Sequence, residues 1–370
     1  MQRMIENFRI GRHAMRYSAF VPRLYNLCRS FGFVRERMMP SRAFCSDESQ
    51  GYPVILMTQH FGTFPFDHGR VGGKVAVNRH GPYAHHGEDL VIVQASHVGY
   101  DADSRRFGVY RRHRTADRAF GDNCGKLCAV LRWYQEEYRH ACEQVLCGVL
   151  DGEAAVSVDN QFLDESRPEG LFLDLDRVID RASGPVKVLS TAKVFRPSSD
   201  LRQRLSETDW QEPPRAIGSG LTADLFTFRR PPAADIEGHD ILEAALQAAM
   251  PALVTSAHPA LDAARYHTQA EFDRTYRSFL REPCYRDKNL LFIAGINIDI
   301  SPREAFPFPL IKFVPWAAYV CLRDGSSFLM EQHEISDALQ RQPLENPERL
   351  SFDEAIQRMA DADEIRLPID

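Results

Sequence analysis

Residues 90–101 have the sequence LVIVQASHVGYD, from which the fold class can be inferred. It begins with a short run of apolar, mostly β-branched residues, which is typical of a strand buried in a sheet. His97 follows this run almost at once, and open α/β sheets bind their ligands at the carboxyl ends of the strands. The stretch therefore predicts an α/β fold with a binding site at His97.

Two distant cysteines have the chemistry to share this site. Cys45 is followed two residues later by Asp47, and Cys124 directly precedes a predicted helix at 126–145, whose N-terminal end would favour a thiolate. Two thiolates and one imidazole leave a tetrahedral Zn²⁺ one open position, as a catalytic metal requires. Because the three residues are widely spaced, they do not form a zinc finger or ribbon, in which ligands come in close pairs.

Each of these residues also has a plainer interpretation. A lone buried cysteine is commonly a core thiol, and His97 alone could be a loop histidine held by its neighbours. Cys128, one helical turn after Cys124, could be the ligand in its place. Asp47 favours the interpretation that the three residues share one metal site, because a carboxylate at that spacing can reach a water bound to the metal.

The order Cys-x-Asp, then strand-His-Val-Gly, then Cys-Gly before a helix resembles the beta-type carbonic anhydrases. The closer resemblance is to their limiting-CO2-inducible B/C branch, which is related to the theta class, and it includes the glycine-rich segment GTFPFDHGR at residues 62–70. It implies a central mixed or parallel sheet flanked by helices, with N-terminal helices and C-terminal additions. It also implies a zinc ion held by Cys45, His97 and Cys124, reversible hydration of CO2 to bicarbonate, and a homodimer.

The sequence departs from the family's pattern beside Asp47. Beta-type enzymes carry Cys-x-Asp-x-Arg, whereas Ser49 occupies the arginine position here. An Asp–Arg pair would then take its arginine from elsewhere, and Arg70 in the glycine-rich segment is the candidate, with Arg42 as a weaker one. Either could instead be an ordinary surface arginine.

The implied chemistry assigns a role to each group. Zinc lowers the pKa of its bound water from ~15.7 to ~7, so hydroxide is available near neutral pH. Asp47 would accept a hydrogen bond from that hydroxide and direct it at the carbon of CO2. Rapid turnover also needs a proton exit. Titratable groups for it lie between the first two ligands: His60, His68, His80, His85 and His86.

The composition is that of a soluble enzyme. The 370 residues are 44% hydrophobic, enough for a sizeable core, and the net charge of −6 argues against nucleic-acid or anionic-membrane partners. Eight irregularly placed cysteines do not form a disulfide framework in a chain of this length, and they indicate a reducing compartment. With no long apolar run for a membrane span, we expect a cytoplasmic protein.

The chain is expected to divide near residue 44. Residues 1–44 are arginine-rich with apolar residues in between, which predicts amphipathic helices broken at Pro22 or, alternatively, an organelle transit peptide. Residues 45–370 would form one α/β domain, with a possible sub-boundary in the polar stretch 197–214. Further strands are predicted at 186–190, 290–296 and 317–322, and a helix at 236–250 that ends at Pro251.

Three functions remain open from the sequence. The first is a zinc carbonic anhydrase. The second is a zinc-binding but catalytically silent homologue that acts as a partner or sensor in inorganic-carbon metabolism, an option that Ser49 keeps open. The third is a thiol hydrolase with Cys124 as nucleophile and His97 as base, which would need no metal.

Overall fold

The computed structural model describes residues 2–69, 89–111, 120–231, 239–286, 288–302 and 309–362. The chain forms two compact units. Unit 1 comprises Met1–Glu6 and Gly125–His267, and unit 2 comprises Asn7–Cys124 and Thr268–Asp370. Residues 45–370, expected to form one domain, are thus divided between both units, because residues 125–267 make most of their contacts among themselves.

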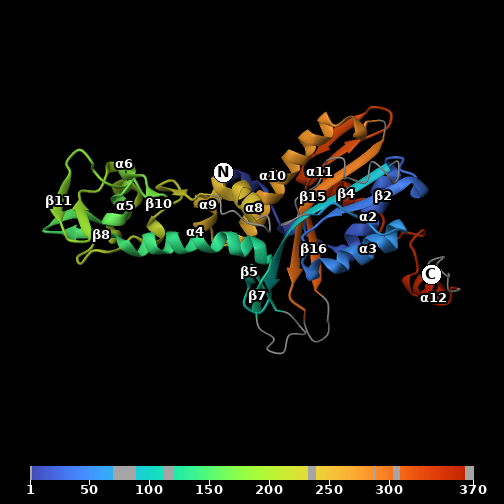
Figure 1. Ribbon diagram of the computed structural model, residues 1–370, viewed down its shortest axis with the longest axis horizontal. Helices are drawn as coiled ribbons and strands as arrows, with labels where there is room; N and C mark the ends of the chain where they lie inside the picture. The colour runs from blue at the N-terminus through green and yellow to red at the C-terminus, as the bar shows by residue number, and fades with distance from the viewer. Residues whose placement is uncertain are drawn as a thin grey trace, which may run out of the picture. The chain divides into compact units, whose positions relative to one another are not determined.

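Unit 2 is built on an eight-stranded mixed sheet (Figure 1). Its central strands β2 (Met38–Ala43), β4 (Asp89–Asp101) and β15 (Asn289–Ile300) run parallel, and β16 (Leu310–Cys321) pairs with β15 antiparallel. The short strands are β1 (Met15–Arg16), β3 (Phe66–Asp67), β5 (Arg106–Phe107) and β17 (Ser327–Met330). This mixed sheet flanked by helices confirms the predicted fold class.

Helices cover both faces of the sheet, and the alternation of strand side chains explains why. Odd-numbered residues of β4 such as Val91 and Val93 pack into a core shared with α2 (Tyr17–Ser30), α3 (Gly51–Phe61) and α11 (Gln332–Gln340). Even-numbered residues such as Leu90 and Ile92 pack against Phe272 and Phe279 of α10 (Pro259–Arg281). Because side chains alternate between the two faces of a strand, a strand that is buried on both faces has a continuous apolar sequence, as observed here.

Strand β4 is longer than the apolar run predicts. It continues to Asp101, so His97 lies inside the strand and not after it. The cause is the neighbouring strand, because β15 stays in parallel register and pairs Asn297 with His97 and Asp299 with Gly99. Residues two apart on a strand share a face, so His97, Asn297 and Asp299 all project to the side covered by α2 and α3.

The N-terminal segment contributes strands as well as helices. α1 (Gln2–Asn7) and α2 are present, but β1 and β2 also lie within residues 1–44 and belong to the central sheet. The predicted break at Pro22 is wrong, because Pro22 lies inside α2. Proline removes one helical hydrogen bond, but the buried apolar face of α2, which includes Phe20 and Leu24, holds the helix against the sheet.

The longer segment of unit 1 begins with α4 (Gly125–Gln144), which matches the predicted helix except that Val145 already opens β8 (Val145–Leu150). Its five-stranded sheet has the order β11-β12-β9-β8-β13 and is accompanied by a β10–β14 pair. Those strands are β9 (Glu153–Asp159), β10 (Gly170–Leu173), β11 (Pro185–Val188), β12 (Ala192–Phe195), β13 (Arg215–Ala216) and β14 (Phe226–Arg229).

Two predictions for unit 1 need correction. The helix predicted at 236–250 is α8 (His239–Leu246) and a 3-10 turn followed by α9 (Met250–Val254), in which Pro251 lies in the first turn and does not end the helix. Proline is tolerated there because the first-turn N–H groups have no helical partner. The polar stretch 197–214 contains the short helix α7 (Ser199–Arg204) and lies within unit 1.

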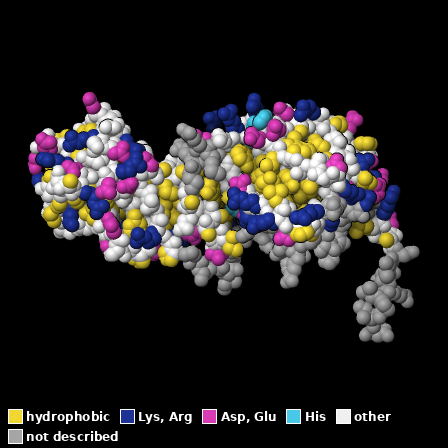
Figure 2. Space-filling view, turned by 90° about the horizontal axis from the view of Figure 1, so that it is seen from above, with side chains coloured by type: hydrophobic (Ala, Val, Ile, Leu, Met, Phe, Trp, Pro, Cys, Tyr) yellow, Lys and Arg dark blue, Asp and Glu magenta, His cyan; other side chains and the backbone are white. Residues whose placement is uncertain are grey.

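The surface of the described residues carries mixed charge. Figure 2 shows Lys and Arg interspersed with Asp and Glu over the face in view, without a broad basic area on that face. Among the described helices, none combines the length and the apolar character needed to cross a bilayer.

His60 makes the stability of unit 2 depend on pH. It lies in the last turn of α3 with its ring buried, and the Asn346 amide donates to its Nδ1 at 3.2 Å and to its carbonyl at 3.1 Å. Burial, with a smaller contribution from Arg349, lowers the pKa of His60 to about 4. The folded state therefore binds this proton less readily than the unfolded chain.

We expect the free energy of unfolding to fall by about 1–2 kcal/mol as the pH drops from 6.5 towards 4, after allowance for solvent screening. Chemical denaturation of the wild type and of His60→Gln across this range measures it. The variant should lack this part of the pH dependence, whereas His333→Gln, at an exposed histidine of the same unit, should keep it. An identical pH dependence for wild type and His60→Gln would contradict the assignment.

Candidate metal centre

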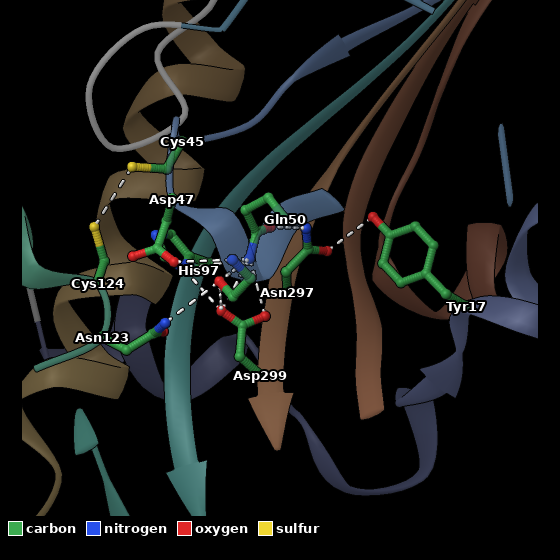
Figure 3. A network of polar contacts seen from close by, with 10 residues as sticks. Tyr17, Cys45, Asp47, Gln50, His97, Asn123, Cys124, Asn297 and Asp299 are labelled. Atoms are coloured by element: carbon green, nitrogen blue, oxygen red, sulfur yellow. Dashed lines mark hydrogen bonds and ion pairs between the residues drawn. The ribbon is translucent and has the colours of Figure 1, made fainter. Parts of the chain in front are cut away.

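Three segments of unit 2 bring their side chains together beyond the carboxyl end of β2. Cys45 comes two residues after β2, His97 lies in β4, and Cys124 stands directly before α4. One potential ligand atom from each lies within 4.8 Å of the others, and the two Sγ atoms are 3.8 Å apart (Figure 3). All three side chains are buried, with residue exposures of 5%, 1% and 2%.

The orientation of His97 leaves one ring nitrogen available. Its Nδ1 lies 2.8 Å from Oδ2 of Asp299, and because a carboxylate only accepts, Nδ1 carries the hydrogen of this bond. Its Nε2 is buried and has no hydrogen-bond partner in the described structure. A buried ring nitrogen without a partner is costly unless something binds it.

The two thiols would bind a cation as thiolates. The contact with Cys45, together with burial, raises the pKa of the Cys124 thiol, so the thiolate is disfavoured when no positive charge is near. Two sulfurs and one imidazole nitrogen form a soft donor set suited to a transition-metal ion. A metal ion could therefore be held by Cys45, His97 and Cys124. Two observations support this: the types of donor atom, and the buried Nε2 of His97.

A shell of buried polar residues supports the group. Ser49 Oγ donates to Oδ2 of Asp299 at 2.8 Å, and Gln50 Nε2 lies 3.0 and 2.9 Å from the two Asp299 oxygens. The Asn123 amide reaches Ser49 Oγ at 3.4 Å. Sequence reasoning missed Gln50, Asn123 and Asp299. Asn297 and Asp299 could have been recognised in the sequence, because they are alternating polar residues within an otherwise apolar strand.

Gly99 allows the Cys124 segment to approach β4. Its N–H donates to the carbonyl of Asn123 at 2.8 Å, and its own carbonyl accepts from Gly108 at 2.9 Å. A Cβ at position 99 would lie only 2.6 Å from the Val109 carbonyl oxygen and 3.0 Å from Cβ of Asn123. The glycine of the His-Val-Gly element is therefore required for close backbone contact.

Asp47 lies beside the group, at the start of the turn between β2 and α3 (Figure 3). The Ser49 N–H donates to its Oδ1 at 3.0 Å. Burial by itself raises the Asp47 pKa, but the charge of His97 and the Ser49 hydrogen bonds outweigh burial and lower it. An ionised carboxyl therefore lies beside Cys45, His97 and Cys124 (Figure 3).

The described structure does not place the remaining candidates at this group. Arg42 pairs with Asp67 at 3.0 Å, and Arg70 falls outside the described residues, as do His80, His85 and His86. Cys128 lies in α4 and is not among the residues that converge on His97. His60 is bonded to Asn346, and His68 is buried with its ring edge-on to Phe66.

Solved structures share this architecture at low sequence identity. PtLCIB4, a homologue of the limiting CO2-inducible protein LCIB, aligns with 86% of this chain and 95% of its own, with a TM-score of 0.51 and 13% identity. The chain has an LCIB-like fold. A histidine-to-alanine variant of PtLCIB4 aligns with 85% of this chain and 92% of its own, with a TM-score of 0.52 and 12% identity. LCIB aligns with 90% of this chain and 98% of its own, with a TM-score of 0.46 and 12% identity.

No protein-family model and no curated protein matches the sequence. The likeness to solved structures therefore concerns the fold, and the chemistry has to be argued from the site.

Proposed function

We propose that this protein is a zinc-dependent enzyme that reversibly hydrates CO2 to bicarbonate. The observation that carries the proposal is the buried group formed by Cys45, His97 and Cys124, in which the His97 Nε2 has no other partner. Three protein ligands of this type leave a fourth position open, as in catalytic zinc sites. The LCIB-like fold and the resemblance of the Cys-x-Asp and His-Val-Gly elements to beta-type carbonic anhydrases support the same reaction.

A zinc ion held there would supply a Lewis acid that makes hydroxide available near neutral pH. Asp47 would accept a hydrogen bond from the attacking water and direct it at the carbon of CO2. Asp299 would hold the His97 ring by its Nδ1–H. His60 is a poor proton carrier at neutral pH, because its pKa of about 4 leaves it almost wholly neutral.

A second candidate is a protein that binds zinc in the same way but does not turn over CO2. Ser49 favours this alternative, because it occupies the position of the family's arginine and its side chain is engaged with Asp299 in the interior. In that case Asp47 would lack the arginine that pairs with it in beta-type enzymes. The protein would then act as a partner or sensor in inorganic-carbon metabolism.

A thiol hydrolase is the third function considered. Cys124, His97 and Asp299 do lie in the order of a nucleophile, base and orienting acid. However, Cys45 and burial raise the pKa of Cys124, whereas a nucleophilic cysteine needs a lowered pKa. A bound cation would offset this cost for thiolate ligands, whereas a hydrolase without metal has no such cation, so we favour the metal site.

Zinc content and stopped-flow CO2 hydration, measured on the same preparation of wild type and Asp47→Asn, test the proposal. We expect about one zinc ion per chain in both proteins. Hydration should fall by about 10²–10⁴-fold in the variant, because the water is no longer oriented. Asp67→Asn is the matched control, since Asp67 is exposed and pairs with Arg42. Zinc without hydration in the wild type would support the silent homologue, and absence of zinc would overturn both.

A further inference from the structure

A chain of buried hydrogen bonds runs from the candidate metal centre to helix α2. Tyr17 lies 2.9 Å from Oδ1 of Asn297, whose Nδ2 lies 2.6 Å from Oε1 of Gln50. Gln50 in turn contacts both oxygens of Asp299, which holds His97. Figure 3 shows these side chains in line from Tyr17 to His97. None of the five residues is more than 1% exposed, so water does not compete for their polar atoms.

The direction of every bond in this chain follows from Asp299. A carboxylate only accepts, so Gln50 must present its NH2 group to Asp299 and its carbonyl to Asn297. Asn297 must then present its NH2 group to Gln50 and its carbonyl to Tyr17, whose hydroxyl therefore donates. Burial raises the pKa of Tyr17, which keeps the proton that this bond requires. All hydrogens of the chain thus point towards Asp299.

When the His97 ring is neutral, as a metal ligand must be, this polarity decides which of its two nitrogens carries the hydrogen. Gln50 Nε2 also lies 3.3 Å from Nδ1 of His97, so Nδ1 could in principle accept from Gln50. In that tautomer Nδ1 would face the Asp299 oxygen at 2.8 Å with two acceptors opposed. Because Gln50 already donates to Asp299 at 2.9 and 3.0 Å, the arrangement with hydrogen on Nδ1 satisfies more bonds.

We propose that Gln50 is a positioning residue that acts through Asp299 to hold His97 in the tautomer with a free Nε2, and that Tyr17 of α2 anchors this chain. The inference rests on the proposed metal site. If it is correct, the affinity for the metal depends on residues that do not contact the metal, and one of them, Tyr17, lies in α2. Groups that orient a metal-binding histidine typically contribute about 10–100-fold in metal affinity.

The decisive substitution is Gln50→Glu, which keeps the side-chain shape but places acceptors against the oxygens of Asp299. We expect zinc affinity, measured with zinc alone by competition against a chelator, to fall by about 10–100-fold. Tyr17→Phe should lower it in the same direction but less, because it leaves the Asn297 carbonyl without its donor. Gln332→Glu is the matched control, since Gln332 is a buried glutamine bonded to Arg9 and Pro315, and it should bind zinc like the wild type.

Nitrogen-15 NMR of histidine-labelled protein loaded with zinc shows which ring nitrogen of His97 carries hydrogen in the wild type. The His97 signals, assigned by their loss in His97→Gln, should show hydrogen on Nδ1 in the wild type. Hydrogen on Nε2 in the wild type, or unchanged zinc affinity in folded Gln50→Glu, would overturn the inference. If the wild type binds zinc but does not hydrate CO2, the proposed reaction fails while the role of Gln50 can still be measured.

Discussion

Replacing Cys45 with serine is expected to abolish zinc binding, from about one ion per chain to nearly none. The Cys45 Sγ lies 3.8 Å from that of Cys124, and both belong to a group buried away from solvent. A serine hydroxyl at this position is a weak, neutral donor, and only two suitable ligands would remain. Metal analysis of the purified variant gives the result directly.

A second readout is thermal. Because a ligand that binds only the folded state stabilises it, a chelator should lower the Tm of the wild type and leave that of Cys45→Ser unchanged. Cys147→Ser is the matched control, since Cys147 is as deeply buried but lies in β8 of unit 1. Full zinc content in Cys45→Ser, or its loss in Cys147→Ser, would show that the ligand assignment is wrong.

Replacing Gly99 with alanine is expected to destabilise unit 2 by about 1–3 kcal/mol and to weaken zinc binding as well. The added Cβ would lie 2.6 Å from the Val109 carbonyl oxygen, which belongs to the backbone and cannot turn away. The segment that carries Asn123 would have to move, and Cys124 is the next residue. Denaturant unfolding and zinc competition measure the two effects on one sample.

Gly121 provides the comparison for Gly99. It lies in strand β7 (Phe120–Asp122), two residues before Asn123, and a Cβ there would meet nothing within 4 Å. Gly121→Ala should therefore retain both stability and zinc. If Gly99→Ala behaves in the same way, close approach at Gly99 does not position Cys124.

The sequence predicts those parts of the site that combine a reactive side chain with a local pattern. His97 stands at the end of an apolar run, Cys45 has an acid two residues later, and Cys124 opens a strongly amphipathic helix. Each pattern reflects short-range constraints on strands, turns or helix ends, and the structure brings the three residues together. The fold class was predictable for the same reason, because strands buried on both faces leave continuous apolar runs.

The residues that sequence reasoning missed depend on contacts between distant segments. Asp299 and Asn297 face His97 only because β15 pairs with β4 in one particular register, which no local pattern determines. Gln50 precedes α3, and its role becomes apparent only from its hydrogen bonds to Asp299. Tertiary packing also explains the error at Pro22, where burial of α2 outweighs the local tendency of proline to end a helix.

X-ray absorption at the zinc edge of the purified wild-type protein identifies the atoms that bind the metal. We expect two sulfur ligands at about 2.3 Å and one imidazole nitrogen at about 2.0 Å, with a lighter atom in the fourth position. Cys45→Ser, where it retains any metal, should lose one of the two sulfurs. A spectrum with four sulfurs, or with only nitrogen and oxygen ligands, would contradict a site formed by Cys45, His97 and Cys124.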